Sequence, residues 1–297
     1  MFNRILPLFA VAGCLAAQSF PTHVAMDALL RIRFYPNQGA FLMDSPIPVL
    51  FPPPGESTGR LLIKKAGGAA VVTKDIVIRP WAPHGAFGEL RTAGNQDSLG
   101  PIHAGDYVVS VEIGGKEVSA YSFSMKSEGS GDAFNPKTEM VRSGPWSKTA
   151  FLTALTDVNV PLAGIGMYVS TRELPGYTAG KHGPFSVHLL RAGAQIGSIE
   201  STATTSDWTF FKGDFHVNKA QGYGFVKWAD VTGTPGAYSV EFRAGGKTLR
   251  SYKFTVAGGK LVMIPANEPS FAGPTALPAQ TLINNRRTQA FWLAPIQ

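Results

Sequence analysis

Two stretches of this chain repeat each other without a gap, at a constant separation of 131 residues. Segment 105–125 carries a Gly-x-Tyr-x-Val start, a Gly-Gly-Lys turn and a closing Tyr-x-Phe, and segment 236–256 carries the same pattern. Eight of the 21 aligned positions are identical. Because each copy must build the same core independently, an ungapped repeat of this length predicts two copies of one domain.

Each repeated segment is predicted to be a β-hairpin. Apolar residues alternate with more polar ones along 107–113, and the two glycines that follow supply the positive φ that a two-residue turn needs. A plain turn would place the apolar residues of 121–125 on the opposite face of the hairpin. We therefore predict a β-bulge near residues 119–120 and another between Leu249 and Tyr252.

The composition favours an all-β fold. With 33 glycines, 22 prolines and only 16% charged residues, the chain is richer in turn formers than in helix formers. Its length of 297 residues accommodates two domains, and an apolar content of 44% is sufficient for two cores.

The succession of short strands, each closed by the Gly-x-Tyr-x-Val hairpin, resembles bacterial extracytoplasmic immunoglobulin-like or fibronectin-III-like domains. At residue level the resemblance covers the closing hairpins, in which Tyr107 and Tyr238 are similar to the tyrosine at the corner of such sandwiches. The cysteine pair of antibody domains is absent, so the resemblance is to the disulfide-free branch. It implies two tandem immunoglobulin-like β-sandwiches that serve adhesion, spacing, or binding of glycans or proteins, without catalysis.

The polar, glycine-rich stretch after the first hairpin is the expected linker between the two domains. We expect each domain to fold alone. The apolar triplet 291–293 in the tail suggests either a strand that docks back on a domain or one that binds a partner's sheet edge. The predicted segments are a signal peptide (1–17), sandwich 1 (22–126), a linker (127–144), sandwich 2 (145–257) and a C-terminal extension (258–297).

The start of the chain has the pattern of an export signal. Arg4 provides a positive charge, residues 5–15 are mostly apolar, and the small residues Ala16 and Ala17 follow. This apolar segment is too short to span a bilayer, which takes about 20 residues. The mature protein is therefore expected outside the cytoplasm, in the periplasm, on the outer surface or secreted.

Cys14 is the only cysteine, so no disulfide can form within the chain. The sequence from Val11 to Cys14 also resembles the bacterial lipobox, in which the cysteine receives a lipid. Simple secretion and lipidation at Cys14 are therefore both open, and the second would provide the only expected contact with a membrane.

The sequence lacks the charge pattern and the motifs that several classes of function require. The net charge is +7, but no basic run or known motif supports nucleic-acid binding. No Gly-x-Ser-x-Gly elbow occurs, the 20 carboxylates are dispersed, and the six histidines lack zinc-type spacing. We therefore expect no enzyme activity, no cofactor and no metal site.

Aromatic residues are densest in 208–228. Trp208 aligns with Trp81 of the first copy and is expected to pack in the core, whereas Trp228 has no counterpart and is expected to be exposed. The sequence thus favours a non-catalytic envelope protein that acts as a structural or protein-binding module. The alternative is a carbohydrate-binding module, in which aromatic faces and polar groups contact the sugar. Its expected ligand-binding residues are Trp228, Tyr223, Asp214 and Lys227.

Overall fold

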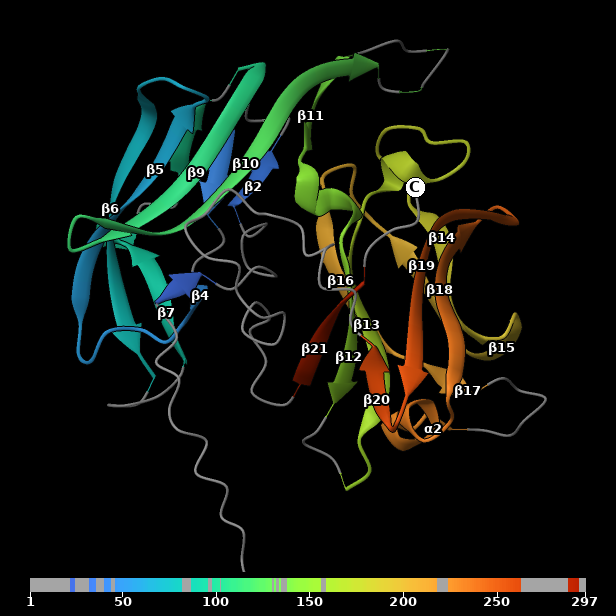
Figure 1. Ribbon diagram of the computed structural model, residues 1–297. Helices are drawn as coiled ribbons and strands as arrows, with labels where there is room; N and C mark the ends of the chain where they lie inside the picture. The colour runs from blue at the N-terminus through green and yellow to red at the C-terminus, as the bar shows by residue number, and fades with distance from the viewer. Residues whose placement is uncertain are drawn as a thin grey trace, which may run out of the picture.

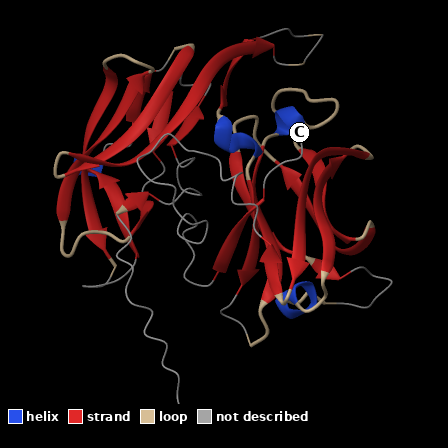
Figure 2. Ribbon diagram, in the orientation of Figure 1, coloured by secondary structure: helices blue, strands red, loops and turns tan. Residues whose placement is uncertain are grey.

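The computed structural model shows an all-β protein made of antiparallel sheets (Figures 1 and 2). The described helical elements are short: α2 (Trp228–Thr232) and the 3-10 turns η2 (Ala93–Asn95), η3 (Pro145–Lys148) and η4 (Thr171–Glu173). The structure describes residues 22–24, 32–35, 40–43, 46–81, 87–95, 98–101, 103–129, 131, 134, 138–155, 159–217, 224–262 and 288–293. The predicted signal peptide, Cys14 and Tyr223 lie outside these residues.

The first β unit contains two sheets. Sheet A has the strand order β1-β4-β7-β6-β5-β9-β10-β11, and sheet B has the order β2-β3-β8. The strands of sheet A are β1 (His23–Val24), β4 (Ile47–Leu50), β5 (Ser57–Lys65), β6 (Ala70–Pro80), β7 (Phe87–Thr92), β9 (Gly105–Ile113), β10 (Lys116–Gly129) and β11 (Thr138–Ser143). Those of sheet B are β2 (Ile32–Tyr35), β3 (Ala40–Met43) and β8 (Ser98–Pro101).

Alternation along these strands builds the first core. Leu61 and Ile63 of β5 lie opposite Val111 and Val109 of β9, and all four are buried. Leu99 of β8 joins the same cluster, so this strand packs on that face of sheet A. The opposite face carries the ion pairs of Glu112 with Arg60 and Lys64, and Leu62 and Ser110 are buried between them.

The second β unit is built from sheet C, with the order β16-β13-β12-β21, and sheet D, with the order β17-β15-β14-β18-β19-β20. Leu152 and Ile165 of sheet C and Val187 and Val240 of sheet D belong to one buried cluster, the second core. The strands are β12 (Ala150–Leu155), β13 (Leu162–Val169), β14 (Gly183–Arg191), β15 (Ala194–Ala203), β16 (Thr209–Asp214), β17 (His216–Val217), β18 (Gly236–Ala244), β19 (Lys247–Ala257), β20 (Lys260–Val262) and β21 (Thr288–Leu293).

Both repeated segments form the predicted hairpins, β9–β10 and β18–β19. Their registers shift at Val118 and Leu249, at or just before the predicted bulge positions. Beyond the first bulge, Tyr121, Phe123 and Met125 are buried in the first core, as expected. The bulge therefore returns the apolar side chains to the interior.

The two units also share their strand order and the contacts of one tyrosine. The strands pair in the orders β6-β5-β9-β10 and β15-β14-β18-β19. Tyr107 donates a hydrogen bond to the carbonyl of His103 (2.9 Å), and Tyr238 donates one to the carbonyl of Thr234 (2.8 Å). Each tyrosine also stacks on the phenylalanine of its hairpin partner strand.

Segments expected to lie outside the domains take part in the sheets. Residues 138–143 of the expected linker form β11, the edge strand of sheet A. Residues 288–293 of the tail form β21, which pairs with β12, and Leu293 is buried in the second core. The apolar triplet thus docks within the chain, which is one of the two alternatives. No helix of the described residues is long and apolar enough to cross a membrane.

Candidate functional site

Three of the four residues expected to bind a ligand lie at the end of the second unit where β13, β16 and α2 meet. Asp214 ends β16 and pairs with Gly164 of β13, Lys227 bridges to Leu162 at the start of the same strand, and Trp228 begins α2. Tyr223 lies outside the described residues.

A short extended segment, residues 224–228, positions these side chains. The amide of Val226 donates to the carbonyl of Phe215 (2.8 Å), and the amide of Ala163 donates to the carbonyl of Val226 (2.9 Å). Phe215 and Val226 are buried in the second core. Their neighbours in sequence must therefore face away from that core.

Trp228 is half-buried and packs against the second core. Phe225 is 43% exposed, so it presents the more accessible ring at this end. The ring of His216 lies 4.5 Å from that of Phe225, centroid to centroid, with an interplanar angle of 39°. This pair was not among the residues predicted from the sequence to bind a ligand. The alternation of Phe225 and Lys227 around Val226 was the signal that could have found it.

The carboxylate of Asp214 lies on the outer face of sheet C, the face turned away from the second core, because the next residue, Phe215, points into that core. Burial raises its pKa, and the positive charges of Lys212 and His216 partly offset the rise. Lys212 and Lys227 are exposed. The end of the unit thus combines an exposed aromatic pair with the carboxylate of Asp214 and the ammonium groups of Lys212 and Lys227.

The two tryptophans aligned between the repeats have different surroundings. Trp208 is half-buried and packs against the first core, although it belongs to the second unit. Trp81 is 47% exposed and stacks on Phe87, with ring centroids 6.3 Å apart. Trp208 therefore contributes to the contact between the two units.

The outer face of sheet C is the main apolar contact with the first unit. Phe151 and Tyr168 are fully buried members of the first core, while their strand neighbours point into the second core. Phe210 packs edge-on against both, and its ring covers Gly166, which has no side chain to obstruct it. Figure 1 shows sheet C as the layer of the second unit nearest the first.

A buried ion pair crosses the same contact. Arg142 of β11 has a fully buried side chain, and its guanidinium bonds both carboxylate oxygens of Asp207. Burial raises the pKa of the neighbouring Tyr121 hydroxyl, while the charge of Arg142 lowers it, that of Asp207 raises it and a hydrogen bond with Arg142 lowers it. Because residues 127–144 were predicted to be a linker, a buried arginine was not expected among them.

A second group of charges joins the β10–β11 hairpin to the turn after β13. Arg172 of η4 lies 2.6 Å from Glu139 of β11 and 3.3 Å from Glu128 of β10. Its guanidinium stacks over the ring of Tyr177, whose hydroxyl donates to Glu139 (2.8 Å). Charge and apolar contacts thus hold the hairpin against the second unit.

Arg250 of β19 forms a third buried group within the second unit. It donates to the carbonyl of Tyr168 (2.7 Å), to Glu173 (3.2 Å) and to the hydroxyl of Tyr252 (3.1 Å). Burial raises the pKa of Glu173 to about 7, although Arg250, a backbone hydrogen bond from Ser170 and Lys148 all lower it. This group ties η4 to sheets C and D.

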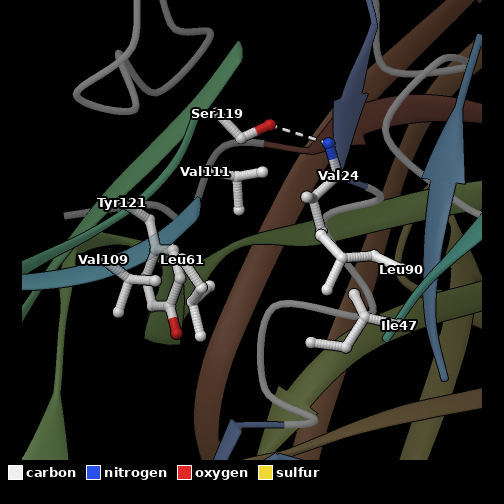
Figure 3. A pocket seen from close by; sticks show the side chains of 8 residues that line it. All are labelled: Val24, Ile47, Leu61, Leu90, Val109, Val111, Ser119 and Tyr121. Carbon is white, nitrogen blue, oxygen red and sulfur yellow. Dashed lines mark hydrogen bonds between the residues drawn. The ribbon is translucent and has the colours of Figure 1, made fainter. Parts of the chain in front are cut away.

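The first core contains a small apolar cavity (Figure 3). It is bounded by Val24, Ile47, Leu61, Leu90, Val109, Val111, Ser119 and Tyr121, and the Ser119 hydroxyl accepts a hydrogen bond from the amide of Val24 (2.7 Å). Its free volume of about 10 Å³ is at the lower limit for one water molecule. The cavity is therefore too small for an organic ligand.

Within the described residues, no group of three histidine, cysteine or acidic side chains is arranged to hold a metal ion. No known family matches the chain, and no similar curated protein or solved structure was found.

Proposed function

We propose that this chain is a non-catalytic exported protein of the cell envelope that acts as a structural or protein-binding module. Removal of residues 1–17 would release two immunoglobulin-like β-sandwiches outside the cytoplasm. Processing at Cys14 would instead leave the same sandwiches attached to a membrane by lipid.

Two observations support the immunoglobulin-like assignment. Each closing hairpin holds a tyrosine whose hydroxyl bonds a carbonyl four residues upstream, as in the corner of such sandwiches. The amide of Ala66 bonds the carbonyl of Asp106 (2.9 Å), and that of Ala192 bonds the carbonyl of Ala237 (2.9 Å), so the turns also pack alike.

The observation that carries the structural role is the contact between the two units. Linked domains move relative to one another unless their interface is large and apolar. Here Phe151 and Tyr168 are buried in the core of the other unit, and the Arg142–Asp207 pair crosses the same contact. A body whose two halves keep a fixed geometry suits the spacing or presentation of partners.

The proposal is tested in intact cells that produce the tagged full chain. A membrane-impermeant amine cross-linker should modify the chain, because exposed lysines such as Lys116 and Lys253 would lie outside the cytoplasm. We expect a discrete cross-linked species of higher mass that contains a second envelope protein. A chain that stays unmodified until the cells are lysed would contradict export, and modification without any cross-linked partner would contradict the protein-binding role.

A second function, carbohydrate binding, is favoured by the exposed Phe225–His216 pair beside Asp214 and Lys227. Flat rings with adjacent polar groups suit a sugar, whose faces are apolar and whose edge carries hydroxyls. Titration calorimetry with soluble oligosaccharides should then show binding that Phe225→Ala removes. Val262→Ala, which truncates another exposed apolar residue of the second unit, should leave the affinity unchanged. Equal affinity in Phe225→Ala would contradict this function.

A further inference from the structure

We infer that the outer face of sheet A, the face turned away from the first core, binds an acidic oligosaccharide through Arg79, Arg91 and Trp81. The carboxylate of a uronic acid lies between the two arginines in this site, and a neighbouring sugar ring covers the tryptophan. The site belongs to the first unit and does not depend on the Phe225–His216 pair.

The pairing of β6 with β7 places both arginines on this face. Arg79 lies opposite Glu89, and Val77 lies opposite Arg91. Leu90, which separates Glu89 from Arg91, is buried in the first core. Because side chains alternate along a strand, the two charged rungs face away from that core.

An aromatic rung follows the charged ones. The amide of Trp81 donates to the carbonyl of Phe87 (3.0 Å), so the pairing continues one step beyond Arg79 and Glu89. The two rings stack, with an interplanar angle of 17°. Trp81 is 47% exposed, so it offers part of an aromatic surface beside Arg79.

An open hollow of about 200 Å³ lies over the charged rungs. It is lined by Val77, Arg79, Glu89, Arg91 and residues 92–94, which lead from β7 into η2. Two guanidinium groups and one carboxylate belong to this lining, so its charge favours a ligand group that is negative.

The guanidinium groups have donors available for such a group. Nε of Arg79 bonds Glu56 (2.6 Å), and Nε and Nη2 of Arg91 bond Glu89 (2.9 and 3.4 Å). Both Nη atoms of Arg79 and Nη1 of Arg91 donate no hydrogen bond within the part of the chain that the structure describes. A planar guanidinium matches a carboxylate, because two parallel N–H groups can bond its two oxygens.

A second hollow, of about 480 Å³, continues the first. Both are lined by Val77 and Ala93, and the second extends to Arg60, Asp75 and Glu112. Two carboxylates accompany one guanidinium there, so hydroxyl groups, which can donate to carboxylates, fit better than a second anion. The two hollows together suit an extended ligand with an acid at one position and neutral hydroxyls at the next.

An oligosaccharide with an acid on every second ring has this order of groups. The apolar face of a sugar ring also suits the exposed surface of Trp81. An acidic peptide suits the site less, because its further carboxylates would be repelled by Asp75 and Glu112.

Titration calorimetry of the full chain with tetrasaccharides of hyaluronan and of unsulfated chondroitin tests the site. We expect saturable binding of at least one of them, which Arg79→Gln and Arg91→Gln each weaken about tenfold or more through the loss of a charged hydrogen bond. Trp81→Ala should weaken it as well. The methyl ester of the tetrasaccharide, which has no charge, should bind as weakly as the acid binds to the arginine variants. Both ion pairs are partly exposed, so the arginine variants should melt near the wild type.

Arg243→Gln is the matched control. Arg243 pairs with Glu241, two residues earlier in β18, as Arg91 pairs with Glu89 in β7. Its loss should leave the affinity unchanged.

Three results would overturn the site. The first is an equal affinity in the wild type, Arg79→Gln and Arg91→Gln. If Phe225→Ala alone then loses affinity, the acidic sugar binds the second unit, and the carbohydrate-binding function proposed above stands. The second is a wild type that binds neither tetrasaccharide. The third is tighter binding of tetraglutamate, which would make the ligand an acidic peptide.

Discussion

Arg142 and Asp207 form a two-point ion pair between the two β units. Nη2 of Arg142 lies 2.7 Å from Oδ2 of Asp207, and Nε lies 3.2 Å from Oδ1. The arginine side chain is fully buried, whereas the side chain of Asp207 is 14% exposed. Breaking one side of such a pair leaves the other charge buried without a partner, and this is costly.

We therefore expect Arg142→Met to lower the free energy of unfolding by about 3–5 kcal/mol. Urea unfolding followed by tryptophan fluorescence measures the loss. Arg79→Met is the control, because the Arg79–Glu56 pair is similarly short (2.6 Å against 2.7 Å) but more than half exposed on both sides. Its expected cost is about 0–1 kcal/mol. Equal losses in the two variants would show that Arg142 does not hold the units together.

Glu173 should make the stability depend on pH. Burial raises its pKa from 4.5 to about 7. The folded state binds this proton more tightly than the unfolded state does. The stabilisation that protonated Glu173 contributes to the folded state is therefore fully present below pH 4.5 and is lost as the pH rises through 7. The free energy of unfolding of the wild type should fall relative to that of Glu173→Gln by on the order of 3 kcal/mol across this range. A wild-type curve that runs parallel to that of the variant would contradict the prediction.

The two glycine turns should respond alike to substitution. Gly115 and Gly246 have φ values of 75° and 74°, with open space where a Cβ would lie. Alanine therefore meets backbone strain and no clash, and each variant should lose about 1–2 kcal/mol of stability. Gly129→Ala, also in open space but with no positive φ, should lose nothing. A clear difference between the Gly115 and Gly246 variants would mean that the two turns are not equivalent.

The tail strand should be essential to the second unit. Leu293 of β21 is 3% exposed and belongs to the second core, so Leu293→Ala should cost about 2–5 kcal/mol. Val262→Ala, at an exposed position of β20, should change the stability by less than about 0.5 kcal/mol. Thermal unfolding of both variants checks this. If Leu293→Ala unfolds at the same temperature as the wild type, the tail strand is not part of the second core.

Local patterns made the hairpins predictable. The alternation before Gly114 and the change of phase after it require a bulge, and the structure places one at Val118 and one at Leu249. Turn chemistry and side-chain period act within a few residues, so one sequence is sufficient to find them.

The contact between the units was not predictable in this way. Arg142 lies in a polar stretch without apolar periodicity, and its partner Asp207 is 65 residues away. Nor does anything near Gly164 in the sequence indicate that it pairs with Asp214. Such pairings depend on which strands lie side by side, and this is a property of the whole fold. The exposure of Phe225 was easier to predict. Its neighbour Val226 has the apolar character of a core position, and strand alternation then places Phe225 on the opposite, exposed side.

The contact also changes what we expect of the separate units. From the sequence, residues 22–126 and 145–257 should each fold alone. The structure places Phe151 and Tyr168 in the first core and takes β21 from beyond residue 257. We now expect the two units to unfold together.

The most direct test of a rigid two-unit body is a distance distribution between the two repeated turns. The chain from residue 18 contains no cysteine, because Cys14 is the only one. Spin labels can therefore be attached at Lys116→Cys and Lys247→Cys, which occupy matching exposed positions after the glycine turns. Pulsed electron paramagnetic resonance should give one narrow distance peak that broadens in Arg142→Met. A broad or multiple distribution in the otherwise unchanged chain would mean that the units hinge freely, and would contradict the proposed structural role.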